Sequence, residues 1–239
     1  MRNTNLTRIA MVALFAAAPL AAQGGGGSMA GMAGMGGRSG DPTMKVMGTG
    51  QLPAGWMMRF DPVPAGQPAH NMKEINFITM AGGYHAYSGP AAIYYTPKDM
   101  AKGEFTVSAT FHQAKSMQHE TYGLFIAGSS LQDASQSYLY FVIRPQDGAY
   151  EVKRRNGDAA PPRVTPVVNA AIAKDDPADG HATNTVAISV TKDSVRFLVN
   201  GKEVSALAKA GLGYSTDGQV GLRINHNLDV HIAGYALKQ

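Results

Sequence analysis

Residues 104–112, EFTVSATFH, alternate apolar and polar side chains along the chain. Phe105, Val107, Ala109 and Phe111 fall on one side of an extended backbone, and Thr, Ser, Thr and His residues fall on the other. Successive side chains of a β-strand point to opposite faces of its sheet. This period of two therefore predicts a strand with one face in a core and the other face in solvent.

The same period recurs through the rest of the chain, in residues 122–127, 138–144, 150–154, 185–191, 195–199, 219–224 and 228–237. Turn signals separate some of these segments. The dipeptides Asp147-Gly148 and Asn200-Gly201 both accept the positive φ of a tight hairpin. Only residues 97–102 and 206–210 have helical patterns, each about one turn long. Roughly ten strands without crossover helices predict an all-β fold, an antiparallel β-sandwich (jelly roll) with short helical turns.

The first 23 residues, MRNTNLTRIAMVALFAAAPLAAQ, have the pattern of a secretory signal peptide. Arg2 and Arg8 precede an apolar run over 9–22, which ends in small residues. A helix over that run is about 21 Å long, shorter than the ~30 Å hydrocarbon core of a membrane. We therefore expect a cleaved signal, no membrane span, and export to the periplasm or the outside of the cell.

Residues 24–50 are rich in glycine and methionine, with 11 and five of them. Such a segment cannot bury enough surface to offset its chain entropy, so we expect a flexible linker. Thioether groups also bind Cu(I), and the spacing of Met29, Met32 and Met35 leaves copper binding as an alternative.

Charge and composition exclude several functions. The chain has no cysteine, which removes disulfide scaffolds, thiolate metal sites and cysteine nucleophiles. Its net charge is +4, but the part after residue 50 has 17 basic and 16 acidic residues, so nucleic acid is not an expected partner. The only basic cluster, residues 153–155, is interpreted as a solvated strand edge. We expect one sandwich domain over 51–239, with its longest irregular segment over 157–182.

The order of the segments resembles the concanavalin A-like lectin and glucanase fold. Within that fold, it is most similar to the LamG-like and 3-keto-disaccharide hydrolase domains of exported bacterial proteins. The hairpin SVRFLVNGKEV (194–204) and the strand GQVGLR (218–223) carry the resemblance, which covers about residues 75–237. It implies a carbohydrate ligand, or a hydrolase or lyase acting on a modified disaccharide.

The chain departs from the catalytic members of these families. Glucanases of this fold carry a carboxylate run of the type E-x-D-x-E, which sets two carboxylates about 5–5.5 Å apart. No such run occurs here. His226 matches the histidine of the hydrolase ending G-L-Q-x-H-G only with a shift of one residue, so no catalytic role is carried over to it.

A ligand-binding face is predicted from residues 138–144, because apolar residues at 139, 141 and 143 would face the core. Tyr138, Tyr140 and Arg144 then share the opposite face, which also receives His112 if its strand is a neighbour. Tyrosine rings stack on sugar rings, while Arg and His bind hydroxyl groups. The predicted ligand-binding residues are His112, Tyr122, Tyr138, Tyr140, Arg144, Tyr84 and His85. A solvated face with tyrosines that favour strands is the alternative.

Other polar groups are candidates for catalysis or metal binding. His119 and Glu120 place an imidazole beside a carboxylate for acid–base chemistry, although neighbours on an extended chain point apart. Asp175, Asp176 and Asp179 lie in one oxygen-rich loop, which makes calcium a possible cofactor. His226 and His231 lack a spaced third zinc ligand. The alternative for each is an ordinary surface loop, and no cofactor is our main expectation.

The sequence thus favours an exported, non-catalytic carbohydrate-binding protein. A hydrolase or lyase acting on 3-keto-disaccharides or related glycosides is the alternative. A third possibility is an adhesion module with a protein partner.

Overall fold

The computed structural model describes residues 48–115 and 120–239, which consist almost entirely of strands and turns. Among these residues, no helix is long and apolar enough to cross a membrane. Two short 3-10 turns occur, Met72–Glu74 and Lys209–Gly211. The strands are β1 (Met57–Phe60), β2 (Ile75–Met80), β3 (Gly83–Ser88), β4 (Ala92–Ala101), β5 (Phe105–Gln113), β6 (Tyr122–Ser129), β7 (Ser137–Arg144), β8 (Ala149–Asn156), β9 (Pro162–Val168), β10 (Ala182–Val190), β11 (Ser194–Val199), β12 (Lys202–Ala208), β13 (Gly218–Ile224) and β14 (Leu228–Lys238).

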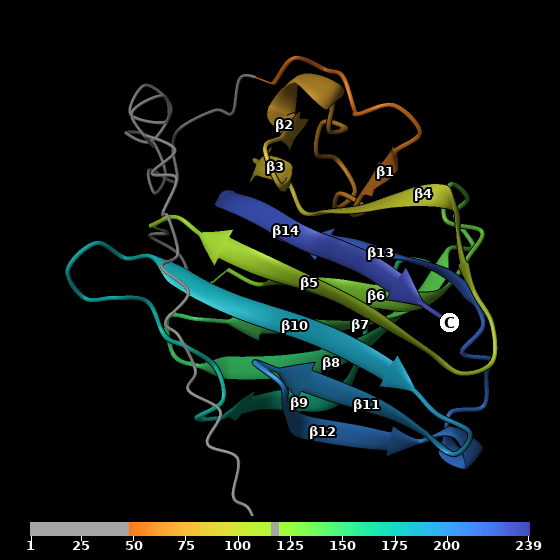
Figure 1. Ribbon diagram of the computed structural model, residues 1–239. Helices are drawn as coiled ribbons and strands as arrows, with labels where there is room; N and C mark the ends of the chain where they lie inside the picture. The colour runs from red at the N-terminus through yellow and green to blue at the C-terminus, as the bar shows by residue number, and fades with distance from the viewer. Residues whose placement is uncertain (1–47, 116–119) are drawn as a thin grey trace, which may run out of the picture. The chain divides into compact units, whose positions relative to one another are not determined.

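The strands form two seven-stranded antiparallel sheets (Figure 1). Sheet A has the order β1-β4-β13-β6-β7-β8-β9, and sheet B has the order β12-β11-β10-β5-β14-β3-β2. The two sheets stack face to face, with β5, β10 and β14 in one layer and β6, β7 and β8 in the other. The predicted antiparallel jelly-roll sandwich is confirmed.

The core lies between the sheets and is built from the alternation seen in the sequence. On β5, Phe105, Val107, Ala109 and Phe111 are at most 4% exposed. They pack in one cluster with the inward residues of β6, β7, β10, β11 and β13. The hairpin between β11 and β12 turns at Asn200 and Gly201, which have φ values of 50° and 77°. Glycine and asparagine tolerate that region of φ, which explains the dipeptide.

Two local predictions are wrong. Residues 97–101 continue β4 rather than forming a helical turn, because Met100 and Ala101 pair with Gln219 and Gly218. The segment predicted to be irregular over 157–182 contains β9, the edge strand of sheet A. The prolines of this segment led to the prediction of an irregular structure. An edge strand tolerates proline, however, because one side of its backbone has no hydrogen-bonded neighbour in the sheet.

A buried amide fixes the long loop after β9. Asn184 on β10 is fully buried, and its Oδ1 accepts hydrogen bonds from Ala173 N and Asn200 Nδ2, both at 2.8 Å. Its Nδ2 donates to Ala173 O at 2.9 Å and to the Tyr122 hydroxyl at 3.4 Å. One side chain therefore joins the loop, a hairpin turn and the core.

Candidate functional site

The outer face of sheet A carries a second apolar cluster, on the side away from the core. It consists of Ile93, Tyr95, Phe125, Leu131, Tyr138, Tyr140 and Val142, all at most 5% exposed. Leu131 belongs to the β6–β7 loop, and Ala160 of the β8–β9 loop also packs against the cluster. Loops of the chain itself thus cover part of the face on which the sequence predicted an open groove.

Beside this cover, a hollow of about 220 Å³ remains open on the same face. Its lining comes from β7, β8, β13, the β8–β9 loop and the segments next to β1, β6 and β13. We call it the sheet A hollow. Its lining residues are Asp61, Thr121, Tyr140, Glu151, Lys153, Arg155, Ala160, Arg223 and Asn225.

The strand register explains why these side chains meet. Arg223 pairs across the sheet with Gly123, Gly123 with Val142, and Val142 with Glu151, so the four residues form one row over four strands. In the next row, Phe125 pairs with Tyr140. Gly123 has no side chain, so the space between Arg223 and the residues of β7 stays open and forms part of the hollow.

A buried charge network forms the bottom of the sheet A hollow. Arg223 donates two hydrogen bonds to Asp61, from Nη1 to Oδ1 at 2.6 Å and from Nη2 to Oδ2 at 2.7 Å. Arg155 Nη2 donates to Asp61 Oδ2 at 2.8 Å. The arginine side chains are 4% and 6% exposed, whereas Asp61 is 25% exposed. Two guanidinium groups thus lie below one carboxylate that solvent can reach.

The protonation states of this network follow from burial and charge. Burial alone raises the pKa of Asp61, but the charge and hydrogen bonds of Arg223 and the charge of Arg155 outweigh it and lower that pKa below 3.8. Burial disfavours the charge of Arg223, but the Asp61 carboxylate more than compensates and raises the Arg223 pKa. Burial raises the pKa of Tyr140 to about 12, so its hydroxyl is neutral at physiological pH.

The rim of the hollow carries further charges. Lys153 Nζ lies 3.0 Å from Glu151 Oε1. Asn225 accepts a hydrogen bond from Arg223 at 3.1 Å and donates one to Glu120 Oε2 at 2.9 Å. His226 Nδ1 lies 3.6 Å from the same Glu120 oxygen. The site therefore presents fixed donors and acceptors around a small opening, with the Tyr140 ring 5.4 Å from the Arg223 guanidinium.

The predicted ligand-binding residues on β7 have three different environments. Tyr140 lines the sheet A hollow. Tyr138 is fully buried in the covered cluster, so no ligand on the surface can touch its ring. Arg144 does not line the hollow, because its guanidinium forms a bidentate pair with Asp147 in the adjacent turn, at 2.6–3.1 Å.

The prediction that His112 shares this face is wrong. His112 lies on β5 in sheet B, whereas Tyr138 and Tyr140 lie on β7 in sheet A, so their outward side chains are on opposite sides of the sandwich. Tyr122 does not meet a ligand either. Its ring is fully buried in the core and stacks on Phe111 with 4.7 Å between ring centroids.

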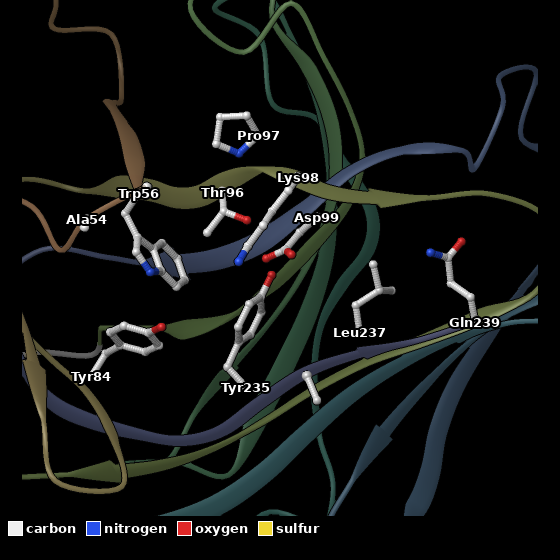
Figure 2. A pocket seen from close by; sticks show the side chains of 12 residues that line it. Ala54, Trp56, Tyr84, Thr96, Pro97, Lys98, Asp99, Tyr235, Leu237 and Gln239 are labelled. Carbon is white, nitrogen blue, oxygen red and sulfur yellow. The ribbon is translucent and has the colours of Figure 1, made fainter.

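Tyr84 and His85 lie on opposite faces of sheet B, because neighbouring residues of a strand point to alternate faces of the sheet. Tyr84 faces the interior and lines a larger pocket at the edge of the sandwich (Figure 2). His85 lies on the outer face of sheet B, where it pairs across strands with His231, which in turn pairs with His112. Their ring centroids are 6.4 and 5.8 Å apart, and this histidine row escaped the sequence analysis.

Of the remaining candidates, Glu120, Asp175, Asp176 and Asp179 lie in segments between strands. His119 lies outside the described residues, and Glu120 contacts Asn225 and His226 instead. In the predicted calcium loop, Asp176 accepts the Ala178 amide at 2.7 Å and Asp179 accepts the His181 amide at 2.9 Å. Asp175 is partly buried, and burial raises its pKa. Among residues 48–115 and 120–239, no group of three or more His, Cys, Asp or Glu side chains is placed to hold a metal ion.

Sequence reasoning missed the central residues of the hollow. Asp61 and Arg223 are 162 positions apart, and nothing in their local patterns indicates that they meet. Arg155 was interpreted as part of a solvated edge, which is wrong because it is 5% exposed. The available signal was the alternation of β8, which puts Glu151, Lys153 and Arg155 on one face, while Arg154 points the other way and lies 3.9 Å above the Tyr214 ring.

Comparison with known proteins identifies the fold. No family model matches the chain, and no curated protein matches it. The carbohydrate-binding module CBM66 from Bacillus subtilis superposes with a TM-score of 0.54 at 10% identity, over 77% of this chain and 96% of that chain. A Bacillus subtilis protein of unknown function with a galectin-like fold gives 0.55 at 14% identity, over 77% and 89%.

The exoplasmic/lumenal domain of VIP36, in its calcium- and mannose-bound form, gives a TM-score of 0.51 at 8% identity, over 77% of this chain and 83% of that chain. At these identities the likeness concerns the arrangement of strands, which agrees with the two seven-stranded antiparallel sheets. The chain therefore has a concanavalin A-like, jelly-roll sandwich fold.

Proposed function

We propose that this protein binds carbohydrate through the sheet A hollow and does not itself carry out a reaction. The observation that carries the proposal is the Asp61 carboxylate, held by two buried arginines at the bottom of an opening that Tyr140 also lines. Such a group meets the ligand in a fixed position, which lowers the entropy cost of binding.

The polar groups of the hollow suit a sugar ring. A carboxylate offers about four acceptor positions, and Asp61 uses three of them for Arg223 and Arg155. About one position remains for a ligand hydroxyl. Lys153 and Glu151 add a donor and an acceptor at the rim, 3.0 Å apart, which matches the spacing of neighbouring hydroxyl groups. The volume of about 220 Å³ is smaller than a typical pocket for a drug-sized ligand, so one sugar ring is the expected occupant.

A binding role fits Asp61 better than acid catalysis. A general acid needs a pKa near the working pH, whereas Arg223 and Arg155 hold the pKa of Asp61 below its ordinary value. The carboxylate thus remains charged and cannot supply a proton near neutral pH. The similarly folded CBM66 is described as a carbohydrate-binding module, which supports the same role here by analogy.

Glycan-array binding followed by affinity electrophoresis in polysaccharide gels tests the proposal. We expect retardation by at least one polysaccharide, weakened several-fold in Lys153→Ala and in Glu151→Gln. Arg144→Gln is the matched control, because Arg144 lies on the same outer face but pairs with Asp147 outside the hollow. An array without binding, or equal losses in all three variants, would contradict the proposal.

A second candidate is a hydrolase or lyase acting on 3-keto-disaccharides. The contact that favours it is Glu120, which lies next to the hollow with its Oε2 3.6 Å from His226 Nδ1. Such a pair can exchange a proton with a substrate at the rim. Turnover of a 3-keto-glucoside that disappears in Glu120→Gln and in His226→Gln would establish this activity, and absence of turnover at all pH values would exclude it.

We also propose that the protein is exported, on the signal-peptide pattern of residues 1–23. Expression of the full chain in a bacterial host, followed by N-terminal sequencing of the periplasmic fraction, tests this proposal. An uncleaved chain confined to the cytoplasm would contradict it.

A further inference from the structure

A second pocket, larger than the sheet A hollow, lies at the edge of the sandwich and is separate from that hollow. Its volume is about 630 Å³, and the two sites share no lining residue. One wall comes from residues 96–99 of β4 in sheet A, and the facing wall comes from β3 and β14 in sheet B together with Trp56 (Figure 2). We call it the edge pocket.

A large bulge in β4 creates the polar wall of the edge pocket. Tyr95 pairs with Gly221 and Met100 pairs with Gln219, so the four residues 96–99 face the single residue Val220. A bulge re-aims side chains that a regular strand would send to alternate faces. Lys98 and Asp99 are adjacent in the sequence, yet both point into the pocket (Figure 2).

The opposite wall is aromatic and closely packed. Trp56 is 8% exposed and contacts Tyr84 and Tyr235, with ring centroids 4.7 and 5.6 Å apart. Phe77 packs behind Trp56 at 5.0 Å in an edge-to-face arrangement. Rings held in this way present a preformed apolar surface to a ligand.

The polar wall includes a buried hydroxyl group without a partner. Thr96 is 5% exposed, and its Oγ1 has no hydrogen-bond partner among the described residues. Figure 2 shows this oxygen on the side of Thr96 that faces the Lys98 and Asp99 side chains, within the lining of the pocket. A buried hydroxyl group without a hydrogen-bond partner destabilises the fold, whereas valine has the same shape and no hydroxyl group. A ligand that completes the hydrogen bond accounts for a threonine at this position.

Asp99 supplies an acceptor beside the aromatic wall. The Tyr235 hydroxyl donates a hydrogen bond to Val220 O at 3.4 Å, and the Asp99 carboxylate lies near enough to influence its titration. Burial and the Asp99 carboxylate both raise the pKa of Tyr235, so the tyrosine stays neutral and keeps a hydrogen to donate. The pocket therefore combines aromatic faces with a carboxylate, an ammonium and three hydroxyl groups, those of Tyr84, Thr96 and Tyr235.

From this combination we infer that the edge pocket is a second ligand site, which binds a short neutral saccharide of one or two rings. A sugar ring has apolar faces for Trp56 and Tyr235, and its edge carries hydroxyl groups for Thr96 and Asp99. The ligand is a free disaccharide or the end of a polysaccharide chain, which share this chemistry. The inference does not depend on the function proposed for the sheet A hollow.

Trp56 is the only tryptophan in the chain, so its fluorescence reports on this pocket alone. The full chain is titrated with maltose, cellobiose and lactose, and separately with the polysaccharides amylose and β-glucan. We expect a saturable change in emission and slower quenching of Trp56 by acrylamide. A response to disaccharides identifies a free sugar as a sufficient ligand, and a response to polysaccharides alone identifies a chain end.

Two variants test the residues. Thr96→Val and Asp99→Asn should each weaken binding about ten-fold, because the first variant lacks the hydroxyl group and the second lacks one carboxylate oxygen of the pocket. Thr110→Val is the matched control, since Thr110 bonds Thr185 on the outer face of sheet B and should bind as the native chain does. No saturable change with any probe overturns the inference, and so does a response that both pocket variants retain in full.

Discussion

Removal of the Asp61 carboxylate should destabilise the fold far more than removal of a similar carboxylate at the surface. In Asp61→Asn, Arg223 and Arg155 keep their charges but lose their counterion, and both are at most 6% exposed. Breaking a buried ion pair from one side costs about 3–5 kcal/mol, because a buried charge is left without compensation. For a folded part of this size, that loss lowers the melting temperature by roughly 6–20 °C.

Asp147→Asn is the matched control. Asp147 also holds an arginine in a bidentate pair, with its Oδ2 2.6 Å from Arg144 Nη2. The side chains are more exposed here, 26% for Arg144 and 34% for Asp147. Exposed pairs contribute about 0–1 kcal/mol, so this variant should unfold within a few degrees of the native protein. Urea titration at constant pH, read by circular dichroism, measures both free energies of unfolding.

The pH dependence provides a second readout for Asp61. The pKa of Asp61 is lower in the folded protein than the ordinary 3.8. The contribution of Asp61 to the free energy of unfolding is therefore fully present above pH 3.8. It disappears as the pH falls through the lower pKa of the folded protein. The native protein should lose stability over that acidic window, and Asp61→Asn should lose less. If Asp61→Asn and Asp147→Asn cost the same free energy, or if the acid profiles coincide, the argument from burial is refuted.

Three further substitutions test single contacts. Asn184→Leu should lower the free energy of unfolding by about 3 kcal/mol or more in urea titrations, because the buried Asn184 amide makes four hydrogen bonds that leucine cannot make. Gly123→Ala should lower the free energy of unfolding by at least about 2 kcal/mol, because its Cβ would lie 2.0 Å from Phe141 O. Gly211→Ala is the control and should leave that free energy unchanged, because its Cβ would meet no atom within 4 Å. Tyr138→Phe should melt within a few degrees of the native protein or above it, because the buried hydroxyl has no partner among the described residues, and a marked loss would contradict this.

Regular alternation made the strands predictable from the sequence. The pattern of β5, with Phe105 and Phe111 inward, depends only on the two-residue period of an extended chain. The turn at Asn200 was equally readable, because its positive φ of 50° is a local property that suits asparagine before glycine. Such features depend on residues that are adjacent in the chain.

The pairing of faces was not predictable in the same way. The period of β5 and β7 indicates which side chains are outward, but not that the two strands belong to different sheets. His112 and Tyr140 were therefore placed on one face, although the sandwich separates them. The same limit applies to Asp61 and Arg223, whose contact depends on the order of strands around β13. Burial of Tyr138 depended on the β6–β7 loop, whose position has no periodic signal.

Both pockets lie next to an irregularity in the central part of sheet A. β13 shifts register between Gln219 and Gly221 against both of its neighbours, β4 and β6. On the β4 side this shift produces the bulge that forms the edge pocket. On the outer face, Gly221 cannot be replaced easily, because a Cβ would lie 2.3 Å from Tyr94 O and 2.5 Å from the Phe125 ring. Arg223, two residues later on the same face, then reaches Asp61 at the bottom of the sheet A hollow. The segment GQVGLR, which carried the resemblance to the lectin fold, thus sets the backbone geometry on which both proposed sites depend.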